Sequence, residues 1–165
     1  MTSNSVRIAT LMAATLTMGL TAGVLALYAH TIMPGLKKTD DHTFVEAFQQ
    51  IDRAIINPWF MVTAFGGALV LTLAAAIANR GTTALPLIAA AFALYLVAVI
   101  VTIGVQVPLN DAIKAAGNPD NIDVAKVRAQ FNEARWTAWN LVRVFATVPA
   151  FGLLSWALVL YGRSS

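Results

Sequence analysis

The sequence contains no cysteine and very little charge. The absence of cysteine excludes disulfides, iron–sulfur clusters, thiolate nucleophiles and cysteine-ligated zinc or haem. Charged residues make up 12% of the 165 residues and hydrophobic residues 58%, against about 25% and roughly 45–50% in soluble chains. A soluble domain of this length needs more charge on its surface, so the composition indicates a protein that lies in a bilayer. The eleven Lys and Arg are spread too thinly for a nucleic-acid-binding surface.

Four long stretches of the chain have no charged residue at all. They lie between Arg7 and Lys37, Arg53 and Arg80, Arg80 and Asp111, and Arg143 and Arg163. About 20 apolar residues cross the core of a bilayer, and helices are the form in which such long apolar runs satisfy their backbone. We therefore predict an all-α integral membrane protein, a single four-helix bundle over 1–165. Its transmembrane helices are expected at about 8–30, 58–79, 84–107 and 141–161.

The segments that follow the first and third spans are long and carry all eight acidic residues. Because they follow the first and the third of four spans, they lie on the same side of the membrane. The first segment has Phe44, Phe48, Ile51 and Ile55 at helical spacing, which predicts an amphipathic helix at about 43–56. The second segment is expected to form an extramembrane helix at about 122–140. This helix should continue without a break into the fourth span.

The charges on the two sides of the membrane give conflicting signals about orientation. The side with the short connection has only Arg7, Arg80 and Arg163, next to the ends of the spans and with no acid. The long segments hold eight Lys and Arg together with eight acids, and the positive-inside rule counts only the basic residues. We give more weight to the arginines that no acid offsets. The expected location is a bacterial cytoplasmic membrane with both termini cytoplasmic.

Two parts of the sequence resemble each other. The segment Phe48–Asn57 can be aligned with Phe131–Asn140, and in each the Phe and the Asn stand nine residues apart. Upstream, Pro34 and Pro108 each close the first span of a half. We predict two tandem halves that run in the same direction, which places their symmetry axis along the membrane normal.

The fourth helix carries polar residues on one stripe, namely Asn132, Trp136, Asn140 and Arg143. Arg143 begins an otherwise uncharged span, and a charge at that position normally faces the bundle interior with a partner. Asp52 and Asp111 are the candidate partners. The alternative is that the Arg143 side chain extends to the lipid headgroups.

Further polar residues gather at the same mouth of the bundle. His30 ends the first span, and Gln106 and Asn110 flank the proline of the third. Three tryptophans near this level are typical of an aromatic belt, or of a surface on which a flat ligand stacks: Trp59, Trp136 and Trp139.

Metal ligation is the less favoured use of the two histidines. His42 and Glu46 stand four residues apart, after Asp40 and Asp41. Histidine and carboxylate could hold copper or iron only if His30 and His42 converge. Otherwise this segment is a solvated loop followed by a helix cap.

The pattern as a whole resembles a known family. Four spans, Pro34, the run Pro108-Leu-Asn110 and the run Trp136-x3-Asn140-x2-Arg143 are similar to the anthrone-oxygenase-like family of small membrane proteins. The resemblance covers about 8–161. Most bacterial members have no assigned activity, whereas fungal members are associated with the oxidation of anthrones to anthraquinones by molecular oxygen.

The resemblance implies a chemistry that needs no metal or flavin. A base removes a proton from the acidic CH₂ of an anthrone, and the electron-rich anion then reduces oxygen. His30 or Asp52 would be the base, and Arg143, Asn110 and Asn140 would hold the oxyanion. Residues expected to contact the substrate are Trp136, Trp139, Trp59, Gln106 and Asn57. No cofactor is expected, with copper or iron at His30 and His42 as the alternative.

Three functions therefore compete. The first is an oxygenase for a hydrophobic, aromatic substrate, which predicts a closed pocket that joins His30, Asn110, Asn140 and Arg143. The second is a non-enzymatic membrane module that binds lipid or a hydrophobic ligand, or serves as an assembly subunit. A transporter would need a continuous polar path, and the short-connection halves of the spans have almost no polar residues. A monomer is compatible with four helices, and the pair Gly19 and Gly23 equally permits a homodimer.

Overall fold

The computed structural model describes residues 3–164, and these residues form helices and connections with no strand. The first half contains α1 (Ser3–Leu27), the π-helix η1 (Tyr28–Ile32), α2 (Met33–Leu36), α3 (Asp41–Ile55), the π-helix η2 (Trp59–Gly66) and α4 (Gly67–Ala78). The second half contains α5 (Leu85–Val101), the π-helix η3 (Thr102–Gln106), α6 (Val107–Ala115), the 3₁₀ turn η4 (Pro119–Asn121), α7 (Val124–Phe131) and α8 (Glu133–Ser164).

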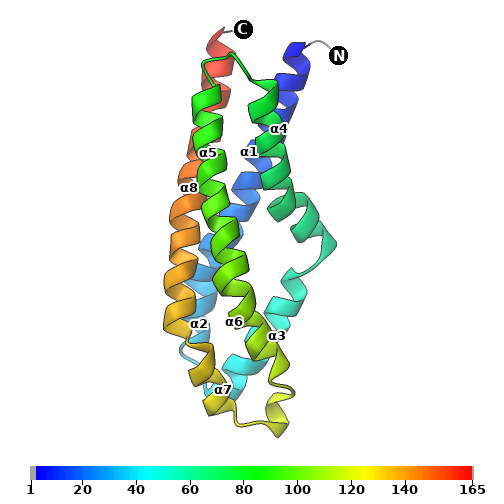
Figure 1. The fold of residues 1–165 in the computed structure, drawn as a ribbon. Helices are drawn as coiled ribbons and strands as arrows, with labels where there is room; N and C mark the ends of the chain where they lie inside the picture. The colour runs from blue at the N-terminus through cyan, green and yellow to red at the C-terminus, as the bar shows by residue number, and fades with distance from the viewer. Residues whose placement is uncertain (1–2, 165) are drawn as a thin grey trace.

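Four helical stretches are long and apolar enough to cross a membrane: Asn4–Leu36, Trp59–Ala78, Leu85–Ala115 and Val124–Arg163. They pack as a bundle in which α1 and α5 each lie between α4 and α8. Both termini and the α4–α5 connection lie at one end, and α2, α3, α6 and α7 lie at the other (Figure 1). The predicted fold, an all-α membrane bundle with both long segments on the same side, is therefore confirmed.

The bundle has two separate cores. The core nearer the termini is rich in small residues, which let helix backbones approach closely in lipid; its buried members include Ala14, Ala68, Ala75, Ala91, Ala146 and Ala150. Gly19 belongs to this packing, because a Cβ there would lie 2.9 Å from the Phe151 ring of α8. The second core lies at the α3 end and is mainly aromatic, with Tyr28, Phe44, Phe48, Phe131 and Trp136.

The α3 helix begins at a side-chain cap. Asp40 has an extended backbone, and its carboxylate accepts hydrogen bonds from the Thr43 backbone N–H (3.0 Å) and hydroxyl (2.7 Å). These bonds hold the pKa of the Asp40 carboxyl below its usual range. The cap therefore persists as the pH falls, until the pH passes through that lowered pKa. Asn57 acts in the same way at the start of the next span, where its Oδ1 accepts from the Phe60 N–H at 2.9 Å.

The prediction of one unbroken helix from about 122 into the fourth span is wrong. The α7 helix ends at Asn132, which has a left-handed backbone with φ 55°. Its N–H donates to the Arg128 carbonyl, and its side chain accepts from the Arg135 N–H at the start of α8. Asparagine tolerates this conformation better than most residues do. Asn132 is exposed, so it does not share the buried stripe of Trp136, Asn140 and Arg143.

Two of the π-helical segments stand immediately before prolines. Pro34 has no N–H to donate to the carbonyl of His30, in the middle of η1, and Pro108 has none for Gly104, in the middle of η3. Each helix widens at the turn where this hydrogen bond is missing. The two segments occupy matching positions in the proposed tandem halves. The second spans differ, because the first half contains η2 whereas α8 has no π-helical segment. The internal repeat stays a prediction.

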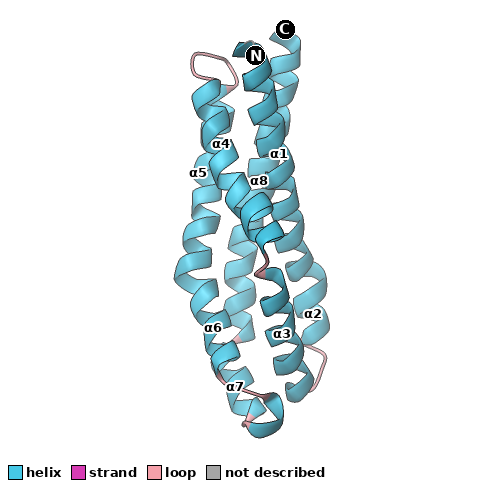
Figure 2. Cartoon of the chain, turned by 90° about the vertical axis from the view of Figure 1, so that its right-hand side faces the viewer, coloured by secondary structure: helices cyan, strands magenta, loops and turns pink. Residues whose placement is uncertain are grey.

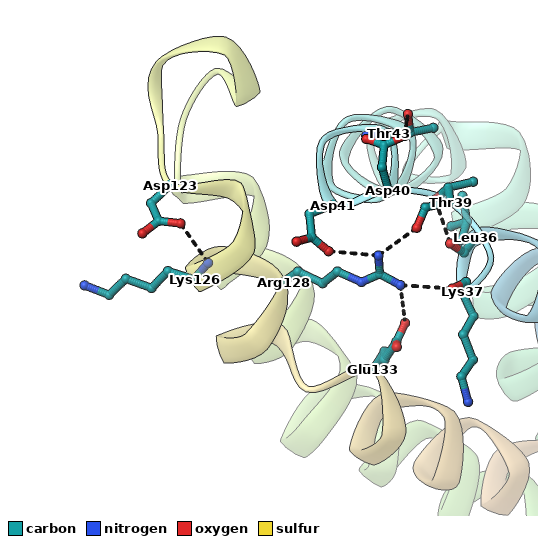
Figure 3. A network of polar contacts seen from close by, with 10 residues as sticks. All are labelled: Leu36, Lys37, Thr39, Asp40, Asp41, Thr43, Asp123, Lys126, Arg128 and Glu133. Atoms are coloured by element: carbon teal, nitrogen blue, oxygen red, sulfur yellow. Dashed lines mark hydrogen bonds and ion pairs between the residues drawn. The ribbon is translucent and has the colours of Figure 1, made fainter.

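The Arg128 side chain links the α2–α3 connection to the start of α8 (Figure 3). Its guanidinium donates to the Thr39 carbonyl (2.9 Å) and the Asp41 carboxylate (3.0 Å), and also to Lys37 O (3.2 Å) and Glu133 (3.4 Å). The guanidinium carbon also lies 4.3 Å from the centroid of the Phe44 ring. This single side chain therefore fixes the α2–α3 connection against the corner between α7 and α8.

We expect Arg128→Ala to lower the free energy of unfolding by about 2 kcal/mol, because two carboxylates and two carbonyls lose a charged donor. Lys126→Ala on the same helix is the matched control, since the Lys126 side chain extends away from this network (Figure 3). The control should change stability by no more than about 0.5 kcal/mol. Thermal unfolding in detergent compares the two variants, and equal effects would contradict the role assigned to Arg128.

Candidate functional site

A cavity of about 160 Å³ lies where the transmembrane bundle meets the α3 end. Every one of the three π-helical segments contributes to its wall: Tyr28 from η1, Phe60, Met61 and Phe65 from η2, and Thr102 and Gln106 from η3. The polar and aromatic residues that α3, α6 and α8 add are Asp52, Asn110, Asp111, Lys114, Trp136 and Arg143. Because π-helical turns often occur at functional sites, this concentration marks the cavity as the candidate site.

A buried acid occupies one end of the cavity. Asp52 of α3 is 5% exposed, and its carboxylate accepts a hydrogen bond from the Asn110 amide at 2.6 Å. The Lys114 ammonium lies 2.8 Å from the other carboxylate oxygen and 3.1 Å from Asp111. A buried carboxylate is strongly destabilising without such partners, so Lys114 and Asn110 stabilise Asp52 and fix its position.

A buried guanidinium lines the same cavity. Arg143 of α8 is 6% exposed and donates to Asn140 Oδ1 (2.8 Å) and to Thr102 Oγ1 (3.2 Å). Asn140 is fixed in turn, because its amide donates to the Leu25 carbonyl at 3.1 Å. Arg143 therefore faces the bundle interior as predicted. The expected partners were wrong, because the hydrogen bonds go to an amide and a hydroxyl and the ion pairs of Asp52 and Asp111 go to Lys114.

Trp136 connects the two charged groups. Its indole N–H donates to Asn110 Oδ1 at 2.7 Å, and its ring centroid lies 5.7 Å from the Arg143 guanidinium carbon. The Trp136 carbonyl accepts from the Gln106 amide at 3.0 Å. One continuous set of contacts thus runs from the carboxylate, through an amide and an indole, to the guanidinium.

Within residues 3–164, and apart from Asp52 Oδ2, whose contact is the ion pair with Lys114, two buried polar atoms of the cavity wall have no hydrogen-bond partner. They are the Nε of Arg143, which is a donor, and the Oε1 of Gln106, which is an acceptor. Buried polar groups are nearly always paired, so an unpaired donor and an unpaired acceptor in one wall indicate a place for a polar ligand group.

Several residues predicted from the sequence lie outside the cavity. His30 is exposed and shares a hydrogen bond with the Thr31 hydroxyl (2.6 Å), so the expected pocket that joins it to Asn110 and Arg143 does not form. Trp59 and Trp139 are exposed on the outside of the bundle. Asn57 caps η2 rather than lining the site. Asn140 contacts the site only through Arg143.

The histidines do not build a metal centre within residues 3–164. His42 lies 2.9 Å from Asp120 and 3.8 Å from Glu46, all at the surface. No group of three or more His, Asp or Glu side chains in this part of the chain is arranged so that it could hold a metal ion. The alternative that His30 and His42 hold copper or iron therefore gains no support from the geometry.

Lys114, Thr102 and Tyr28 are the site residues that sequence analysis missed. Lys114 follows Asn110 by one helical turn, and Thr102 precedes Gln106 by one turn in an otherwise apolar stretch. This four-residue spacing on a single helix could have identified both. Tyr28 carries no such signal.

The fold and the cavity define a small integral membrane protein with a partly polar, aromatic-walled site. The chain matches the anthrone oxygenase family over residues 53–153, and it belongs to that family. The resemblance seen in the sequence is thereby confirmed. The matched region contains Asn110, Trp136 and Arg143, and Asp52 immediately precedes it. No curated protein and no solved structure matches this chain.

We expect Trp136→Phe to lower the free energy of unfolding by about 1–2 kcal/mol, because Asn110 Oδ1 loses its donor while the ring packing is largely kept. Trp139→Phe, three residues along the same helix and exposed, should change it by no more than about 0.5 kcal/mol. Thermal unfolding of the two variants in the same detergent checks this. Equal stability would show that the indole hydrogen bond contributes nothing.

Proposed function

We propose that this protein is an oxygenase that uses molecular oxygen to oxidise a flat, hydrophobic aromatic ketone of the anthrone class. The observation that carries the proposal is that Asp52 and Arg143, both buried and of opposite charge, line one apolar cavity with Trp136 between them. Membership of the anthrone oxygenase family supports the same class of substrate.

The size of the cavity fits an aromatic ring. An apolar cavity of about 150 Å³ is known to bind benzene, and this one measures about 160 Å³. One ring of a three-ring substrate would be enclosed beside Trp136. The remaining rings would then extend towards the apolar rim at Ile56 and Met61.

The reaction begins with transfer of a proton from the CH₂ of the substrate to Asp52. The resulting anion gives one electron to oxygen, and the substrate radical and superoxide combine to form a C–O bond. Protonation yields a hydroperoxide. Loss of the second CH₂ proton, with cleavage of the O–O bond, leaves a carbonyl and releases hydroxide, which becomes water. One oxygen atom enters the quinone and the other enters water, which balances the four-electron reduction of oxygen.

The site residues divide these tasks. Removal of the proton places negative charge on the substrate ketone oxygen, and the unpaired Nε–H of Arg143 is the donor available to hold it. The unpaired Oε1 of Gln106 would accept a hydrogen bond from a phenolic group of the substrate. Asn140 and Thr102 position Arg143, and Asn110 positions Asp52. His30 has no part in this scheme.

One observation favours a second function. The carboxylate of Asp52 is already paired with Lys114 and Asn110, so both of its oxygens have a partner before any substrate arrives. A cavity with this wall could bind a hydrophobic ligand without transforming it. The second candidate is therefore a membrane module that binds such a ligand.

We also propose a setting for the protein, namely a bacterial cytoplasmic membrane with both termini in the cytoplasm. Arg7, Arg80 and Arg163 lie at the end that carries the termini, where the sequence has no acid. A homodimer would use the outer apolar faces of the bundle, where Gly23 is exposed with open space around it, whereas Gly19 packs against Phe151 of α8.

The test is oxygen uptake and quinone formation by the protein in lipid nanodiscs supplied with a hydroxylated anthrone. We expect Asp52→Asn to lower the rate above the protein-free background by at least about 100-fold, because the proton acceptor is lost. We expect Arg143→Gln to lower it about 100-fold, because the developing oxyanion loses its charged donor.

The matched controls are Glu46→Gln and Arg53→Gln, which change an exposed acid and an exposed base of the same helix, α3. Both should keep the full rate. Wild-type uptake no faster than that of empty nanodiscs would overturn the oxygenase. If such protein still binds the anthrone tightly, the binding module is the function.

A further inference from the structure

The rim of the cavity is apolar where it is exposed. The lining residues Ile56, Met61 and Val107 are 55%, 39% and 43% exposed, and they come from the α3–η2 connection, from η2 and from α6. Asp111 and Lys114 complete the rim on the side nearer the α3 end. The cavity thus opens sideways, between η2 on one side and the η3–α6 helix on the other.

This opening exists because η2 diverges from the third span. The chain breaks at Asn57 and Pro58, and η2 leaves the bundle at an angle before α4 returns to it (Figures 1 and 2). The main packing of η2 is against α1 and α4, with no comparable packing against η3 or α6 within the described residues. Residues of both η2 and η3 line the cavity beside this divergence.

The surroundings of the opening are those of a lipid-facing surface. Met61 and Val107 belong to candidate membrane-spanning stretches, and the neighbouring side chains that point outward are also apolar and exposed, namely Val62, Ile100 and Ile103. Apolar residues exposed on a spanning helix contact the hydrocarbon of the bilayer. A molecule that crosses this rim therefore comes from the membrane.

The other directions are closed. Behind Trp136, the buried aromatic core with Phe48, Phe131 and Ile113 separates the cavity from water. Towards the termini, Phe65 and Tyr95 pack against each other, and the Tyr95 hydroxyl donates to the Phe65 carbonyl at 2.7 Å. Beyond them lies the small-residue core.

We infer that the ligand of this site is a flat aromatic molecule dissolved in the bilayer, which reaches Trp136 and Arg143 through the lateral opening between η2 and the η3–α6 helix. The inference rests on the proposed function for the class of ligand. It adds the route and the membrane as the source. The polar edge of the ligand passes Asp111 and Lys114, at the interfacial side of the rim, while its rings pass Met61 and Val107.

The test blocks the rim with a single thiol label. Because the chain has no cysteine, Met61→Cys creates one unique site for a bulky, membrane-permeable maleimide. The matched control is Val62→Cys with the same label, since Val62 is the next residue, 67% exposed, and outside the cavity wall. The readout is the rate at which anthraquinone in lipid vesicles quenches Trp136 fluorescence, measured after Trp59, Trp139 and Trp156 are changed to Phe.

Labelling at Met61→Cys should slow quenching at least about tenfold, whereas labelling at Val62→Cys should change the rate less than about twofold. Equal rates at the two positions would overturn the lateral route. If the labelled Met61 variant does not fold, Val107→Cys with Ile103→Cys as its control examines the opposite side of the same opening, with the same two outcomes.

This readout is independent of turnover. Slow quenching in the labelled protein together with no oxygen uptake in the wild type would sink the oxygenase and leave the lateral route intact. Normal quenching after labelling, together with normal oxygen uptake, would overturn the lateral route and leave the oxygenase standing.

Discussion

Arg143 places a full charge inside a helix that is otherwise apolar, and the site is organised by the way that charge is satisfied. No carboxylate of residues 3–164 forms an ion pair with it; an amide, a hydroxyl and the face of an indole surround it instead. The acid of the cavity, Asp52, has its own cation in Lys114. Two opposite charges thus share one apolar space without neutralising each other. Because the salt bridge of Asp52 is with Lys114, no ion pair cancels the charge of Arg143, and its field extends into the cavity.

The π-helical turns explain how a bundle of close-packed helices leaves such a space open. Prolines at 34 and 108 remove a backbone donor one turn after His30 and Gly104, and the helix widens there. A widened turn rotates the residues that follow it, which brings Gln106 and Asn110 to the same wall as Trp136. The short helix that contains Pro108, α6, also supplies Asn110, Asp111 and Lys114 to the cavity wall. The same backbone feature therefore shapes the site.

The sequence predicted the features that depend on hydropathy and helical spacing. Charge-free windows located all four spans, and spacing along one helix placed Trp136, Asn140 and Arg143 on one inward stripe. It did not predict features that depend on geometry between distant segments. The partner of Asp52 is Lys114, which lies 62 positions away along the chain. Arg128 gathers contacts from three segments, and the left-handed turn at Asn132 depends on a single residue. His30 was expected in the site because it ends a span, but which face of the helix it occupies was decided by the π-turn around it.

The two cores separate the part of the chain that anchors it in lipid from the part that surrounds the cavity. The alanine-rich core holds four helices together through backbone proximity, and none of the polar cavity residues belongs to it. Substitutions in the cavity wall can therefore alter the shape and polarity of the pocket without repacking the anchor. Related proteins built on this scaffold can therefore differ in the shape and polarity of the pocket while the bundle stays the same. Shared architecture among such proteins is then a poor guide to which compound each of them handles.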